Sequence, residues 1–146
     1  MLKINSSGLP IAITQGDSAG IGPETIVQAF RDAPELLRGC FVVGEVATLR
    51  RAAASVRPGE PLVPLAVLDH PAQAWEAPPR CVPLWPLPDL PGPQPWGQVS
   101  ALAGQAAGQC VQWAARAALR GEVAAPLQKE ALAAAGASSP GHNQLL

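Results

Sequence analysis

The residues best suited to chemistry lie in one stretch of the chain, Ile11 to Ile26, which reads IAITQGDSAGIGPETI. The apolar, β-branched run at its start is typical of a strand buried on both faces of a parallel sheet. Three glycines then allow a tight turn and a close approach of the main chain to a ligand or a partner strand. Pro23 suits the first position of a helix, and the carboxylate of Glu24 suits its first turn. The stretch therefore predicts a strand that stops at Gln15–Gly16, a glycine loop, and a helix that begins at Gly22 or Pro23.

Two phosphate-binding loops are excluded by spacing. A Walker loop requires GxxxxGK followed by Ser or Thr, and the segment that starts at Gly16 has no lysine at the required position. A dinucleotide fingerprint GxGxxG that starts at Gly20 would need a glycine where the chain has Thr25. The carboxylate of Glu24 would also compete with a phosphate for the exposed N–H groups of the helix start. We therefore expect no cofactor pyrophosphate at this loop.

The glycine loop and two later segments carry a resemblance to a known family. GDSAGIGPE at Gly16 to Glu24 resembles GDPAGIGPE, the signature of the 4-hydroxythreonine-4-phosphate dehydrogenase family of pyridoxine biosynthesis, with Ser18 in place of the family proline. QKEALAAAG and PGHNQLL, at 128–136 and 140–146, resemble the family segments NKEALxxAG and PGHTExL. GQVSALAGQAAG at 97–108 is similar to the preceding family helix. The resemblance covers nearly the whole chain, but only the N-terminal part of the family.

The resemblance assigns roles to individual residues. His142 matches the family histidine that binds the phosphorylated substrate, and Asn143 stands where the family has threonine. Lys129 matches a family lysine that could meet a substrate oxyanion. The alternatives are an exposed histidine near the chain end and a solvated lysine in a first helical turn. Asp17, in the glycine loop, is either a polar lid on the substrate cleft or an aspartate that caps backbone N–H groups.

The resemblance also implies an activity. It is the NAD(P)-dependent oxidation and decarboxylation of 4-hydroxythreonine 4-phosphate to 3-amino-2-oxopropyl phosphate, by a homodimer that needs NAD or NADP and a divalent metal. In the family the metal histidines and most of the cofactor site follow the GHT segment, so the metal ligands are absent from these 146 residues. We therefore expect this chain to be inactive alone. It would be a fragment of an intact enzyme, a paralogue acting on another four-carbon phosphorylated hydroxy acid, or a non-catalytic truncated remnant.

Composition and charge bear on the binding partners, the location and the cysteine roles that this chain can have. The 146 residues suffice for one domain, and the 10 basic and 11 acidic side chains are scattered, so no basic surface is expected for a nucleic acid or a membrane. The N-terminus lacks the apolar core of a signal peptide, and no apolar run is long enough to cross a membrane, which favours a cytoplasmic protein. The three cysteines, Cys40, Cys81 and Cys110, fit neither a disulfide framework nor a zinc pattern, and we expect them in the core.

The elements that must position these residues follow an alternating pattern. A short apolar run at 39–44 predicts a second buried strand, and Val46 to Val56 has the composition of a helix. Most of the 17 prolines fall between 58 and 96, a segment predicted to form a packed cover that carries Trp75, Trp85 and Trp96. Prolines at this density exclude a central strand, so only short edge strands are expected there, at 62–68 and 81–87.

A long helix is predicted from Val99 to Arg120, with Ser100 as its cap. Its spacing predicts one buried face, made of Leu102, Ala106, Cys110, Trp113 and Ala117. Gly104 and Gly108 lie four residues apart and indicate close packing, either in the core or at a dimer interface.

The segment after this helix is short. Between Gly121 and Pro126 the chain is about four residues shorter than the family pattern. The residues that remain are too few for a typical strand. We therefore expect residues 1–146 to form a single incomplete domain, a truncated α/β layered fold like that of isocitrate and isopropylmalate dehydrogenases, with one central strand shortened or missing. Such a sheet should expose apolar edges and favour association.

Overall fold

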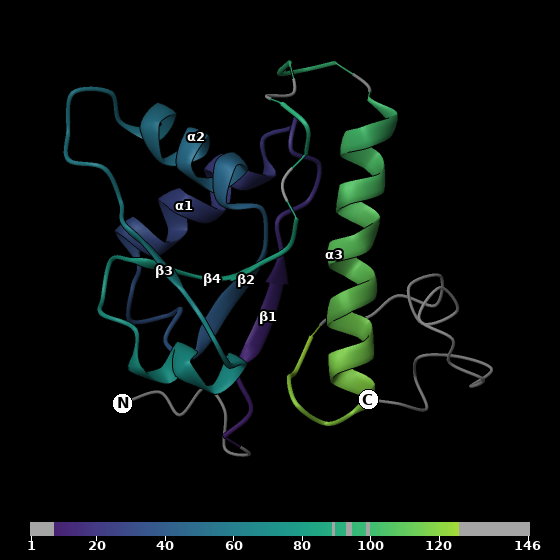
Figure 1. Cartoon of the computed structure of the whole chain (residues 1–146). Helices are drawn as coiled ribbons and strands as arrows, with labels where there is room; N and C mark the ends of the chain where they lie inside the picture. Colours follow the sequence, from purple (N-terminus) through teal and green to yellow (C-terminus); the bar gives the residue numbers. More distant parts are fainter. Residues whose placement is uncertain (1–7, 89, 93–94, 99, 126–146) are drawn as a thin grey trace.

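The computed structural model describes residues 8–88, 90–92, 95–98 and 100–125, which form an α/β fold around a parallel sheet (Figure 1). The sheet has four strands in the order β1-β2-β4-β3, which are β1 (Ile11–Thr14), β2 (Cys40–Gly44), β3 (Leu65–Val67) and β4 (Val82–Pro86). The helices are α1 (Gly22–Asp32), α2 (Val46–Val56), the 3-10 helix η1 (Pro71–Glu76) and α3 (Ala101–Leu119). The predicted ends of β1 and β2, the start of α1 and the bounds of α2 are confirmed.

β2 is the centre of the fold because all five of its residues are buried. Its side chains alternate between two clusters, since successive residues of a strand point to opposite faces. Cys40 and Val42 pack with α1 and α2 on what we call the first face of the sheet. Phe41 and Val43 pack with α3 and η1 on the second face. The continuous apolar run in the sequence thus reflects a strand that is covered on both sides.

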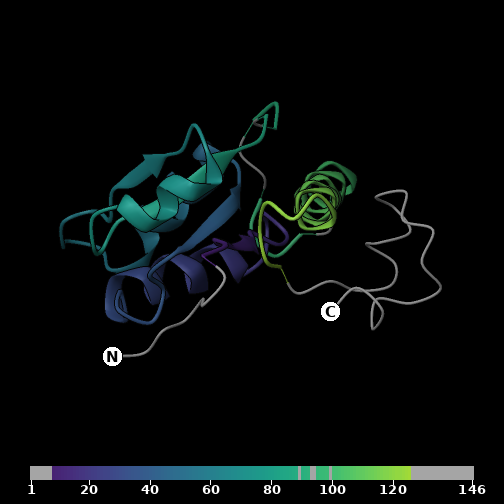
Figure 2. The ribbon, with the colours of Figure 1, turned by 90° about the horizontal axis from the view of Figure 1, so that it is seen from below.

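The two faces are covered differently. On the first face α1 and α2 pack side by side, and the core is built from large aliphatic and aromatic side chains such as Val27, Phe30 and Leu49. On the second face α3 packs on β1 and β2, while η1 packs on β2. Figure 2 shows α1 and η1 on opposite sides of the sheet, with α3 seen end-on beside β1. The three predicted core cysteines are all buried.

The prediction that the proline-rich segment contains no central strand was wrong. β4 lies between β2 and β3, although it contains Pro83 and Pro86. Val82 N donates to Pro64 O, and Leu84 O accepts from Leu68 N, both at 2.9 Å. The backbone N and O atoms of Val82 and Leu84 therefore point toward β3, and those of Pro83 point toward β2. Pairing with β2 begins only after Pro83, and pairing with β3 ends before Pro86. Each proline therefore occupies a point where the missing N–H has no strand to reach.

The tryptophans of this segment do more than cover the sheet. Trp75 belongs to η1, and its Nε1 donates to Gly8 O at 3.1 Å, as a packed cover would predict. Trp85 is part of β4 itself, and its ring stacks on Trp113 of α3 with centroids 5.1 Å apart. Trp96 is half exposed and lies against Arg51, whose guanidinium carbon is 4.2 Å from the ring centroid. Only part of the segment is therefore a cover.

α3 confirms its predicted cap but not all of its predicted buried face. Ser100 Oγ accepts from Ala103 N at 3.2 Å. Leu102 is 45% exposed, so its placement on the buried face was wrong. Of the two alternatives for Gly104 and Gly108, the described residues do not show packing in the core, because a Cβ added at either would meet no described atom within 4 Å. No helix in the described part of the chain is long and apolar enough to cross a membrane.

The short segment after α3 adds one point of pairing to the sheet. Ala124 forms an isolated parallel bridge with Ile11, in which Ala124 N donates to Pro10 O at 2.9 Å and Ala12 N donates to Ala124 O at 2.8 Å. Within the described residues, which end at 125, this segment contributes one bridge beside β1.

Candidate functional site

The glycine loop leaves β1 at the carboxyl edge of the sheet as a four-residue turn. Gly20 N donates to Asp17 O at 3.0 Å, and Ala19 N donates to Asp17 Oδ1 at 2.8 Å. An aspartate at the first position of a turn commonly makes this second bond. Of the two interpretations of Asp17, the geometry shows the backbone-capping role for one carboxylate oxygen, on a residue that is exposed.

Ser18, which replaces the family proline, is a buried polar residue in this turn. It occupies the second turn position, where proline is favoured because its fixed φ suits the turn. Its side chain is buried, and its hydroxyl has no hydrogen-bond partner within the described residues. A buried hydroxyl without a partner costs free energy that a proline at the same position would not.

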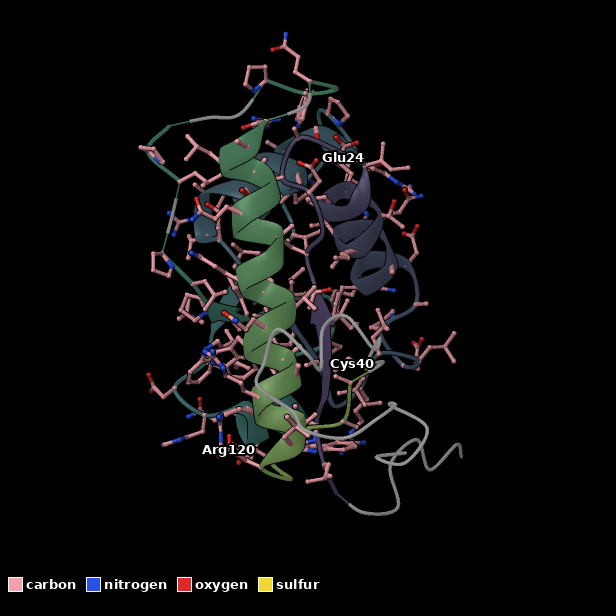
Figure 3. The ribbon with its side chains drawn as sticks, turned by 90° about the vertical axis from the view of Figure 1, so that its right-hand side faces the viewer. Glu24, Cys40 and Arg120 are labelled. Atoms are coloured by element: carbon pink, nitrogen blue, oxygen red, sulfur yellow. The ribbon has the colours of Figure 1, made fainter. Side chains whose placement is uncertain are left out.

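The start of α1 lies close to the end of β1. A Cβ at Gly22 would come within 2.8 Å of Gln15 O, so only glycine fits there. Ile21 supplies no side-chain cap, and Glu24 lies in the first turn (Figure 3). This carboxylate therefore occupies the positive end of the helix, where it complements the helix dipole.

Two buried polar side chains meet where β1 and β2 end. Gln15 and Glu45 are 0% and 2% exposed and make two hydrogen bonds to each other. Gln15 Nε2 donates to Glu45 Oε1 at 3.0 Å, and Glu45 N donates to Gln15 Oε1 at 2.9 Å. Gly44 is required beside them, because an added Cβ would collide with the Gln15 side chain. The carboxyl edge therefore contains a fixed, desolvated carboxylate.

The segment between β4 and α3, described at residues 87–88, 90–92 and 95–98 and here called the strap, crosses this edge. Leu90 N donates to Glu45 Oε2 at 2.6 Å, and Gly97 N donates to Ala19 O at 2.8 Å. The strap is therefore bonded both to the buried carboxylate and to the glycine loop.

Cys110 of α3 lies near Gln15 and Glu45, and its thiol is unreactive. Burial and, secondarily, the charge of Glu45 raise the pKa of its thiol to about 12. The thiol is thus neutral at physiological pH and is no nucleophile.

A separate hollow of about 470 Å³ lies beside the C-terminal half of α3. It is lined by Leu87, Pro88, Gln109, Gln112, Trp113, Arg116 and Arg120. Arg120 lies at the opposite end of the molecule from Glu24 (Figure 3) and pairs with Glu122 through bonds of 2.9 and 3.1 Å. This pairing raises the pKa of Arg120 and lowers the pKa of Glu122. Both side chains are exposed, so the pair is a surface contact.

Of the residues predicted to bind substrate, only Asp17 lies in the described part of the chain; His142, Asn143 and Lys129 lie outside it. The described ranges hold no group of three or more His, Cys, Asp and Glu side chains that could bind a metal. Sequence reasoning missed Gln15 and Glu45. A signal for them exists, since each polar residue directly follows a predicted parallel strand, and the carboxyl ends of such strands meet at one edge. Burial on both faces holds for β2 but was wrong for β1, in which only Ala12 is buried.

Three comparisons place this chain among known proteins. It is 42% identical over 141 residues to the D-threonate 4-phosphate dehydrogenase of Pectobacterium atrosepticum, covering 93% of this chain and 42% of that protein. It is 37% identical over 150 residues to the 4-hydroxythreonine-4-phosphate dehydrogenase of Trichlorobacter lovleyi, covering 98% and 44%. The crystal structure of 4-hydroxythreonine-4-phosphate dehydrogenase from Klebsiella pneumoniae matches with a TM-score of 0.67 at 40% identity, covering 94% and 43%.

The chain thus spans less than half the length of each of these relatives. Residues 37–146, most of the chain, match the family described as "Pyridoxal phosphate biosynthetic protein PdxA". The chain therefore belongs to the PdxA family.

Proposed function

We propose that this chain belongs to a NAD(P)-dependent dehydrogenase that acts on a four-carbon phosphorylated hydroxy acid. The leading substrate is 4-hydroxythreonine 4-phosphate, which is oxidised and decarboxylated to 3-amino-2-oxopropyl phosphate in pyridoxine biosynthesis. The observation that carries the proposal is the PdxA family match over residues 37–146, supported by relatives named as dehydrogenases of such compounds. A homodimer, a cytoplasmic location and an isocitrate/isopropylmalate-dehydrogenase-like layering belong to the same proposal.

The contribution of this chain concerns the substrate. Residues 8–88, 90–92, 95–98 and 100–125 offer no donor set for the divalent metal, and Glu24 makes the α1 start unsuitable for a cofactor phosphate. The glycine loop lies at the carboxyl edge of a parallel sheet, where ligands of such folds bind. We assign substrate contacts to His142, Asn143 and Lys129, and the shaping of the loop to Asp17.

A second candidate substrate is D-threonate 4-phosphate. The observation that favours it is the 42% identity to the Pectobacterium atrosepticum enzyme that bears this name. The two compounds are four-carbon phosphorylated acids that differ at the second carbon, which carries an amino group in one and a hydroxyl in the other. A site that hydrogen-bonds one of these groups discriminates strongly against the other.

Calorimetric titration of the chain with each compound tests the proposal. We expect one of them to bind, and we expect His142→Ala to weaken that binding at least tenfold, because an imidazole donor to the phosphate would be lost. His70→Ala, the same change at the other histidine, serves as the control and should leave binding unchanged. Absence of binding by either compound would contradict the proposal. The expectation that the chain does not turn over alone is checked by NAD(P)H absorbance with a divalent metal present.

A further inference from the structure

One carboxylate, Glu45, joins three separate parts of the chain. Its Oε1 accepts from Gln15 Nε2 at the end of β1 and from Thr48 Oγ1 in α2, at 3.0 and 3.2 Å. Its Oε2 accepts from Leu90 N of the strap at 2.6 Å. Since Glu45 itself follows β2 directly, this one side chain links two strand ends, a helix start and the strap.

The donors and acceptors of this pair are fully specified. Glu45 receives three donors, which suits an ionised carboxylate because it only accepts. The Gln15 amide cannot be flipped, since its Oε1 accepts from Glu45 N while its Nε2 donates to Glu45 Oε1. A glutamine at position 45 would place its NH₂ group against either the Gln15 NH₂ group or the Leu90 N–H. Every arrangement of that single variant therefore leaves two donors facing each other.

The place of the pair in the fold suggests its role. β2 and β4 are neighbours, but the chain leaves β2 for α2 on the first face and leaves β4, through the strap, for α3 on the second face. In open α/β sheets, ligand sites lie outside the carboxyl ends of strands at such a point of divergence. Here the Gln15 and Glu45 side chains occupy that position and attach the strap.

Two other contacts hold the strap over the same edge. Gly97 N donates to Ala19 O in the glycine loop at 2.8 Å. The ring of Trp96 lies against Arg51 of α2, with 4.2 Å between the guanidinium carbon and the ring centroid. The strap and the glycine loop are therefore one bonded unit.

We propose that Gln15 and Glu45 are positioning residues, which fix the strap against the glycine loop and so shape one wall of the substrate site. The link to substrate rests on the proposed function, whereas the attachment of the strap does not. For this role the pair must present one acceptor group to Leu90 N and complementary hydrogen-bonding groups to each other. An apolar or merely space-filling role does not require these groups.

Exchanging the two side chains tests this requirement for complementary hydrogen-bonding groups. In the double variant Gln15→Glu with Glu45→Gln, the new carboxylate accepts from the backbone N–H of residue 45 and from the new amide, whose oxygen accepts from Leu90 N. Each single variant instead brings together two carboxylates or two donors. Glu60→Gln, at an exposed carboxylate paired with Arg31, is the matched control for the loss of a charge.

Amide hydrogen exchange of the ¹⁵N-labelled chain is the first measurement. We expect each single variant to speed exchange at Leu90 and Gly97 about 10- to 100-fold relative to the amides of β2, because a hydrogen bond to a charged group is lost. The double variant should restore slow exchange, and Glu60→Gln should not change it. If a single variant does not fold, recovery of the folded state by the double variant supports the proposal equally.

The proposal is overturned if the single variants leave Leu90 exchange unchanged, if they speed it no more than the β2 amides, or if the double variant does not recover. Calorimetry with 4-hydroxythreonine 4-phosphate and D-threonate 4-phosphate is the second measurement. Affinity for whichever compound binds should fall in the single variants and return in the double variant. If the unmodified chain binds neither compound, the proposed function fails while the exchange result still decides whether the pair positions the strap.

Discussion

The two faces of the sheet are built from different materials. The first face carries two helices packed on each other, and its cluster contains Phe30, Leu49 and Leu84, which interdigitate with the valines of the strands. The second face carries α3, whose buried residues are all alanine apart from Cys110. Large side chains on that face include Leu68, Trp85 of β4 and Trp113, whose ring meets Phe41 edge-on at 6.1 Å.

This difference indicates which face contributes more to folding stability. Short alanine side chains let a helix approach the sheet closely but bury little apolar area per residue, and burial contributes roughly 25 cal/mol per Å². α3 also leaves Leu102, Val111 and Leu119 partly exposed on its outer side. The first face should therefore dominate folding stability, while the second face should tolerate change.

The largest expected effect is at Leu49, which is fully buried between α2 and the sheet. Leu49→Ala should reduce the free energy of unfolding by about 2–5 kcal/mol, because it removes buried methyl groups and leaves a cavity. Leu102→Ala, the same change on exposed α3 surface, should alter it by less than about 0.5 kcal/mol. Urea unfolding of both variants measures the difference. Equal losses would show that the exposed side of α3 is covered in solution.

A substitution at Ser18, in the turn that precedes α1, should increase the stability of the chain. Ser18→Pro should raise the free energy of unfolding by about 1–2 kcal/mol, since it removes an unpartnered buried hydroxyl and stiffens the unfolded chain. Ser18→Ala should give only the first part of this gain. Thermal unfolding of the three proteins separates the contributions. A loss of stability in Ser18→Pro would mean that the turn does not accept the φ of proline.

Cys110 makes the second face sensitive to alkaline pH. Its pKa of about 12 in the folded chain exceeds the ordinary thiol value of 9.0, so its contribution to stability is complete below pH 9 and is lost as the pH rises toward 12. At pH 10 the loss should be about 1.4 kcal/mol. Cys110→Ala lacks this term, so the stability difference between the two proteins should shift by that amount between pH 8 and pH 10. A pH-independent difference in urea unfolding would show that the thiol is reached by solvent.

The sequence predicted the first face well because one rule decided each element. α1 is marked by Pro23, α2 by its apolar spacing, and β2 by a continuous apolar run, and all three appear at the expected positions. β4 was not predicted as a central strand because prolines are usually excluded from such strands. A proline is tolerated where its missing N–H has no neighbouring strand to bond, and the register that decides this is not visible in one sequence.

The candidate site was predicted in part. The glycine loop, the start of α1 and the capping by Asp17 follow from local turn chemistry. Gln15 and Glu45 are 30 residues apart in sequence, and their pairing depends on β1 and β2 being adjacent and parallel. Local patterns cannot supply such a contact, although polar residues at the ends of two predicted parallel strands are a usable signal.

Gly104 provides the smallest expected effect and the sharpest test of the outer side of α3. A Cβ there would meet no described atom within 4 Å, so Gly104→Ala should stabilise the chain by roughly 0.5–1 kcal/mol through helix propensity alone. Gly44→Ala is the contrasting control, because its Cβ would collide with the Gln15 side chain and should destabilise the chain. Sedimentation velocity reports the mass of each variant. If Gly104→Ala instead lowers stability and converts a dimer to a monomer, the helix is closely packed against a second copy, and the weakly built face is one half of an interface.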